Sequence, residues 1–127
     1  MRMNLKPEIE SLTEAVIGAA FEVSNVLGHG FLEAVYRRAF ASELTNRGTP
    51  FEKEVSFHIS YKETEVGISV ADFVIDHHVI VELKAVKRLN DTHVGQVLKY
   101  LRASDLGVGL LFNFGRPKVE FRRVLAP

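Results

Sequence analysis

Apolar residues near the N-terminus recur every three or four positions, the period of an amphipathic helix. The positions that carry this pattern are Ile9, Leu12, Val16, Ala19 or Ala20, Val23 and Leu27. Pro7 suits a first helical turn and Gly28-His29-Gly30 ends the run, so the pattern predicts a helix over residues 7–27. A second helix is expected over residues 31–46, closed by Gly48.

The hydrophobic period then changes to two. Val55, Phe57, Ile59 and Tyr61 alternate with polar residues, which predicts a strand over 51–61 with one buried face. A turn and a second strand over 65–75 follow. The next run, 79–86, is nearly all apolar and is expected to be a central strand.

The last third of the chain returns to a helical period and ends in two short strands. Asn90 is an N-cap candidate for a helix that carries Val94, Val97, Leu98 and Leu101. Strands are predicted over 107–114 and 119–124. The order ααβββαββ implies a mixed central sheet flanked by helices, in the α/β or α+β class. We expect residues 1–127 to form a single domain, because this length suits one core.

Composition narrows the classes of protein that fit. The chain has no cysteine, which excludes disulfide frameworks, thiol nucleophiles and cysteine-based zinc sites. It has no apolar run of the ~18 residues that a membrane span needs and no secretory signal pattern, so a cytoplasmic setting is expected.

The net charge is zero, but the charges are unevenly distributed along the chain. Residues 1–83 carry 7 basic and 13 acidic residues, whereas residues 84–127 carry 9 basic and 3 acidic residues. This asymmetry hints at a surface that faces a polyanion, although solvated helix faces give the same count.

Three charged residues occupy strand positions where the pattern favours apolar ones. Asp72 falls in phase with Val66, Ile68, Val70 and Val74, which predicts that it shares their buried face. Glu82 and Lys84 similarly share a face with Ile80 and Val86. Buried charges cost several kcal/mol unless they are paired or bound to metal. A structural ion pair, or an edge strand that exposes all three, is the alternative to a functional site.

The loop between the second and third strands decides how these charges meet. If residues 76–78 form a three-residue loop, Ile75 pairs with Val79, and Asp72 then lies opposite Glu82 on the same side of the sheet. Two facing carboxylates repel each other unless a cation lies between them. A two-residue loop would place them on opposite faces, so a metal site depends on the loop length.

The second helix brings a fourth acid toward the sheet. Glu33 follows helical spacing with Tyr36, Phe40 and Leu44, so it lies on or beside the apolar face. There it either complements the helix dipole or extends toward the same metal ion.

These residues together resemble a known family. The segment Gly30-Phe31-Leu32-Glu33-Ala34-Val35-Tyr36 resembles the motif of the GxxExxY family, and Asp72 followed by Glu82-Leu83-Lys84 resembles the signature of the PD-(D/E)XK nuclease superfamily. Gln96 to Tyr100 is similar to the Q-x-x-x-Y helix motif of many such nucleases. The resemblance runs from about Leu12 to Val124. Ala71 stands where the signature often has proline.

The resemblance implies a restriction endonuclease-like core and Mg²⁺-dependent hydrolysis of nucleic acid, with DNA the expected substrate and Mn²⁺ a substitute ion. Mg²⁺ prefers oxygen ligands, so the implied ligands are Asp72, Glu82, Glu33 and the backbone carbonyl of Leu83. Lys84 would orient or deprotonate a water molecule and stabilise charge on the phosphate.

Three further residues are candidates for substrate contact or for support of the site. Gln96 could hold a phosphate or a water molecule, and Tyr100, one helical turn later, could support it. Their alternative is a solvated helix face. Tyr36 is a candidate from the same motif, with a packed core position as its alternative. His77 and His78 are expected to be exposed hairpin residues.

A different class of function also fits the sequence. The zero net charge and the small size are compatible with a non-catalytic nucleic-acid or protein interaction module that keeps the nuclease-like fold. The acidic and basic parts could also mediate homodimerisation.

Overall fold

The computed structural model describes residues 5–127 and has the predicted element order. The elements are α1 (Pro7–Leu27), α2 (Glu33–Asn46), β1 (Phe51–Tyr61), β2 (Thr64–Ile75), β3 (Val79–Lys84), α3 (Asp91–Ser104), β4 (Val108–Asn113) and β5 (Glu120–Leu125). The strands form one sheet in the order β1-β2-β3-β4-β5, in which β3 and β4 are parallel and the other neighbours antiparallel. In the described part of the chain, no helix is long and apolar enough to cross a membrane.

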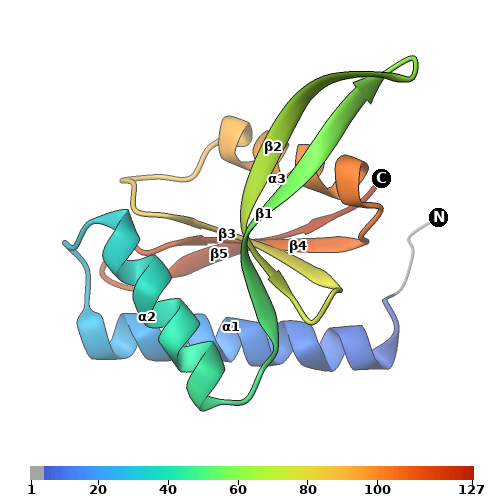
Figure 1. The fold of residues 1–127 in the computed structure, drawn as a ribbon. Helices are drawn as coiled ribbons and strands as arrows, with labels where there is room; N and C mark the ends of the chain where they lie inside the picture. The colour runs from blue at the N-terminus through green and yellow to red at the C-terminus, as the bar shows by residue number, and fades with distance from the viewer. Residues whose placement is uncertain (1–4) are drawn as a thin grey trace.

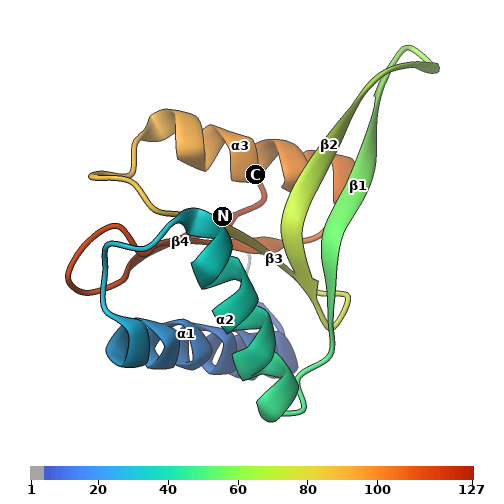
Figure 2. The ribbon, with the colours of Figure 1, turned by 60° about the vertical axis from the view of Figure 1, so that its left-hand side comes forward.

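Helices cover both faces of this sheet. Helices α1 and α2 pack on one face and α3 on the other, as Figures 1 and 2 show from two directions. Strand β3 is the middle strand, and only its last residue, Lys84, is not fully buried. The prediction of a mixed sheet with a central apolar strand, flanked by helices, is therefore confirmed. This arrangement brings the end of β3 close to both helical layers.

The outer parts of β1 and β2 form an arm that extends beyond the helices (Figure 1). On this arm Val66, Ile68 and Val70 are 59%, 56% and 48% exposed, so the prediction that they share a buried face with Val74 is wrong. The buried side of β2 changes at Asp72: Phe73 packs in the core beside α1 and α2, whereas Ala71 packs in the core beside α3.

A local distortion of β1 lies opposite this change of side. Glu54 has a φ of 52°, a left-handed conformation that is rare for a residue other than glycine. The regular pairing of the two strands is interrupted there, between the pairs Lys53–Phe73 and Val55–Ala71. Such irregularities bend a strand and increase its twist. The bend occurs directly beside Asp72.

Strand β3 ends at Lys84, two residues before the predicted end, because a side chain takes the place of the next strand bonds. Asn113, at the end of β4, accepts a hydrogen bond from the Val86 backbone N–H (2.9 Å) and donates one to the Val86 carbonyl (2.9 Å). It also accepts from Gly115 N–H and donates to Glu120. Asn113 is fully buried, and it turns the chain away from the sheet after Lys84.

Replacement of Asn113 by alanine would leave backbone groups of Val86 and Gly115 without these partners. Each buried polar group that loses its partner costs about 1–3 kcal/mol. Because three part-buried backbone groups lose a partner, we expect Asn113→Ala to lower the free energy of unfolding by roughly 3 kcal/mol, as measured by urea denaturation. Asn46→Ala, at the exposed end of α2, is the control, and an equal loss in both variants would contradict this role.

Candidate active site

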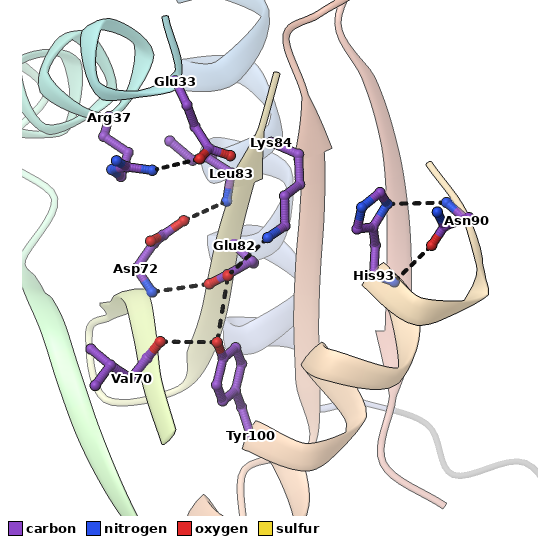
Figure 3. A network of polar contacts seen from close by, with 10 residues as sticks. All are labelled: Glu33, Arg37, Val70, Asp72, Glu82, Leu83, Lys84, Asn90, His93 and Tyr100. Atoms are coloured by element: carbon purple, nitrogen blue, oxygen red, sulfur yellow. Dashed lines mark hydrogen bonds and ion pairs between the residues drawn. The ribbon is translucent and has the colours of Figure 1, made fainter. Parts of the chain in front are cut away.

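Two carboxylates meet where β2 and β3 separate. The strands pair at Phe73–Val81, Val74–Ile80 and Ile75–Val79, which confirms the three-residue loop and continues to place Asp72 opposite Glu82. Side chains, not strand bonds, join them there (Figure 3). The Asp72 N–H donates to Glu82 Oε1 (3.1 Å), and the Leu83 N–H donates to Asp72 Oδ2 (2.8 Å). Each carboxylate is thereby held by the backbone of the opposite strand.

Lys84 and Tyr100 approach the same carboxylate from two sides. Lys84 Nζ lies 3.7 Å from Glu82 Oε2, with a fifth of the lysine side chain exposed. The Tyr100 hydroxyl lies 3.4 Å from that oxygen and donates to the Val70 carbonyl at 2.9 Å. Because α3 packs closely on the sheet, Tyr100 is buried beneath the site. Glu82 thus has one cation and one hydroxyl group beside it.

Burial and mutual repulsion make this pair costly to ionise. Burial is the largest cause that raises the pKa of Glu82, from 4.5 to about 7, and the Asp72 carboxylate adds to it. Burial also raises the pKa of Asp72, although the Leu83 hydrogen bond and Arg37 oppose the change. Burial and the two carboxylates raise the pKa of Tyr100, which stays a hydroxyl donor at neutral pH. A bound cation would remove much of this cost.

Two other candidate residues, Glu33 and Gln96, lie near the carboxylate pair on helices α2 and α3. Glu33 is the first residue of α2, and its Oε2 pairs with Arg37 Nη1 at 3.1 Å. Its charge raises the pKa of both Asp72 and Glu82. Gln96 on α3 forms a side-chain hydrogen bond that lowers the pKa of Tyr100. Glu33 and Gln96 thus flank the carboxylate pair from opposite faces of the sheet.

Tyr36 lies in the core. It is fully buried and stacks on Phe114, with ring centroids 4.8 Å apart. Its hydroxyl donates to the Gly28 carbonyl (2.7 Å) and accepts from the Phe31 N–H (3.3 Å), so it holds the connection between α1 and α2. This connection begins the helix that carries Glu33. Tyr36 therefore supports the site through the position of α2.

A pocket of about 240 Å³ gives access to Asp72 from the α2 side. It is lined by Ala34, Arg37, Arg38, Ala41, Lys53, Glu54, Asp72 and Phe73. Three of these residues are cations and two are acids, so an anionic group that enters the pocket would meet a net positive lining beside the Asp72 carboxylate. Arg37 lies on the helix face of Glu33 by its spacing in the sequence but was not among the predicted site residues, although its position four residues after an acid was a usable signal.

The donor set suits a hard divalent cation. Within residues 5–127 no third histidine or acidic residue joins the pair to complete a cluster of three. In the same part of the chain, no hydrogen bond reaches the second Asp72 oxygen, Oδ1. The Leu83 N–H donates to Asp72 on β2, and because the N–H and carbonyl of one strand residue point to the same side, the Leu83 carbonyl is a further candidate oxygen ligand. Mg²⁺ commonly binds to one or two carboxylates and completes its shell with water and substrate phosphate.

Comparisons with known proteins give a family and a similar fold. A family model described as the PD-(D/E)XK nuclease superfamily matches residues 10–124. A solved structure titled "Crystal structure of SSO0001" is similar over 74% of this chain and 50% of that chain, with a TM-score of 0.61 and 18% identity. At that identity the likeness shows the fold, and the chain spans about half the length of that protein. No curated protein matches the chain.

Proposed function

Because the chain belongs to the PD-(D/E)XK nuclease superfamily, we propose that it hydrolyses phosphodiester bonds of DNA with a divalent metal ion at the Asp72–Glu82 pair. Mg²⁺ is the proposed ion, and Mn²⁺ its substitute. The observation that carries the proposal is the convergence of two carboxylates and one lysine at the opening between β2 and β3. A purely structural ion pair would need no second carboxylate, which raises the cost of burial.

Each residue of the site has its own role in the proposed reaction. Asp72 Oδ1, a Glu82 oxygen and the Leu83 carbonyl would hold the ion, which when bound polarises the phosphate and acidifies water. Lys84 would orient the attacking water and stabilise the negative charge that develops on the phosphate. The Tyr100 hydroxyl holds the Glu82 carboxylate in place. Arg37 lies on the side from which a phosphate would enter.

The proposal is tested by Asp72→Asn, which keeps the shape of the side chain and removes its charge. We expect this variant to cleave fluorescently labelled DNA about 100-fold more slowly in 5–10 mM Mg²⁺, because metal binding loses one anionic ligand. Asp76→Asn, in the exposed hairpin loop, is the matched control and should cleave at the wild-type rate. The initial rate of cleavage of duplex and single-stranded DNA, with RNA in parallel, is the measurement.

Three outcomes would contradict the proposal in whole or in part. Equal cleavage by Asp72→Asn and the wild type would remove the carboxylate pair from the mechanism. Absence of cleavage by the wild-type protein, with DNA binding retained, would instead favour a non-catalytic interaction module. Cleavage of RNA alone would keep the chemistry and change the substrate.

A further inference from the structure

Two loops that follow the parallel strands β3 and β4 carry only positive charge. They are residues 85–90 and residues 114–119, here called the basic loop pair. Their charged residues are Lys87, Arg88, Arg116 and Lys118, without any carboxylate. All four side chains are exposed. Both loops extend from the same edge of the sheet (Figure 2).

The two loops are held together in one rigid arrangement. Asn113 binds both backbone groups of Val86 in the first loop and the Gly115 N–H in the second. The backbones touch at Gly115, where a Cβ atom would lie 2.3 Å from the Val86 carbonyl oxygen. Only glycine fits this contact without a shift of the chain. The backbone contacts between the loops therefore fix the positions of the residues that carry the four positive charges.

The contacts of Arg116 show how the cations are brought close together. Arg116 Nη1 donates to the Lys87 carbonyl at 3.2 Å, which joins the second loop to the first. An open pocket of about 300 Å³ lies between the loops, lined by Lys87, Arg88, Gly115, Arg116 and Pro117. Like charges brought together without counter-charges repel each other. The cost of this arrangement is offset when a polyanion binds.

The basic loop pair adjoins the active site without being part of it. Lys84 is paired with Asn113 across the sheet, and the Phe114 N–H donates to the Lys84 carbonyl at 2.8 Å. The first loop begins one residue after Lys84, at the end of β3 and next to the Asp72–Glu82 pair. A nucleic-acid strand held at Lys84 therefore passes next to these four cations.

We propose that the basic loop pair binds the phosphodiester backbone of duplex DNA on one side of the bond to be cleaved. The inference rests on the proposed function for its substrate. Contacts to phosphates position the duplex and carry no sequence information. A net charge of zero is compatible with this binding, because the two loops themselves carry four basic residues and no acidic one.

The test is the binding of a labelled 20-base-pair duplex by fluorescence anisotropy, in EDTA so that no cleavage occurs, at several salt concentrations. The variant Lys87→Gln with Arg88→Gln should bind about tenfold more weakly at 100 mM salt. The slope of log affinity against log salt concentration should fall in magnitude by about 1–2, which is the change expected for one or two lost phosphate contacts. The matched control is Lys62→Gln with Arg122→Gln, two exposed cations elsewhere, and it should stay within about twofold of the wild type.

Unchanged affinity and salt dependence in the loop variant would overturn the inference. An equal loss of affinity in the control variant would also overturn it, because the loss would then be an effect of net charge alone. Tighter binding of a single strand of the same length would overturn the choice of duplex. The outcome is separable from that of the nuclease proposal. Cleavage that depends on Asp72, with normal binding by the loop variant, would reject the inference alone, whereas weakened binding without any cleavage would reject only the nuclease activity.

Discussion

Replacement of Lys84 by methionine should lower the rate of metal-dependent DNA cleavage by about 10³ to 10⁴-fold. The ammonium group lies 3.7 Å from Glu82 Oε2, and among residues 5–127 this is the only ion pair that involves either carboxylate of the pair. Loss of a group that both handles a proton and stabilises transition-state charge removes several kcal/mol of catalysis. Methionine keeps the apolar stem, so the packing beside Glu82 should persist.

Single-turnover cleavage of labelled duplex DNA at saturating Mg²⁺ measures this effect without a contribution from product release. Lys62→Met, at the exposed tip of the arm, is the matched control and should retain the wild-type rate. Retention of more than a tenth of the wild-type rate by Lys84→Met would contradict the catalytic role of Lys84. A thermal melt of both variants separates loss of chemistry from loss of folding.

Replacement of Glu82 by glutamine should stabilise the metal-free protein at pH 8. A pKa raised from 4.5 in the unfolded chain to about 7 in the fold corresponds to roughly 3 kcal/mol of destabilisation when the group is ionised. Glutamine keeps the shape and removes the charge. The free energy of unfolding at pH 8 in EDTA, from urea denaturation, should therefore rise by about 1–3 kcal/mol.

The pH dependence follows from the same pKa. Between pH 4.5 and about 7 the folded protein binds more protons at Glu82 than the unfolded chain, so this group makes stability fall as pH rises through that window. Its stabilising effect is complete below pH 4.5 and lost above about 7. The wild type should lose stability across this range more steeply than Glu82→Gln, whereas Glu63→Gln, in the exposed turn of the arm, should follow the wild type.

Magnesium provides a second measurement of the same site. A cation that binds the ionised pair competes with protons, so Mg²⁺ should raise the melting temperature of the wild type more at pH 8 than at pH 6. Glu82→Gln should lose most of this increase. Equal stabilisation of both proteins by Mg²⁺ would show that the ion binds elsewhere.

The sequence predicted the register that assembles the site only for one of the two loop lengths considered, and the structure has that length. Residues 76–78 form a short loop between two strands, and once its length is known, the antiparallel geometry brings Asp72 opposite Glu82. The apolar run of β3 likewise predicted its central position, which the strand order confirms. These features depend on neighbours in the sequence or on a period of two. They can therefore be predicted from one amino-acid sequence.

The features that the sequence did not predict depend on irregular backbone, on side-chain rotamers or on contacts distant in sequence. Period-two reasoning assumes a regular strand, so it assigned Val66 to a buried face and could not anticipate the left-handed backbone of Glu54 beside Asp72. The premature end of β3 depends on Asn113, 27 residues from its partner Val86. An asparagine among the apolar residues of β4 was the available signal. The pairing of Glu33 with Arg37 also depends on rotamers that helical spacing does not specify.

The separation of contacting residues along the chain also has a consequence for folding. Asp72 and Glu82 are ten residues apart and are joined by a hairpin, a structure that forms in microseconds. The contact between α1 and the segment before β5, in which the Val119 N–H donates to Ser24 Oγ, joins residues 95 apart. Closure of such a long loop costs more entropy and comes later. During synthesis, the two acids can therefore meet before α1 closes on the segment that precedes β5.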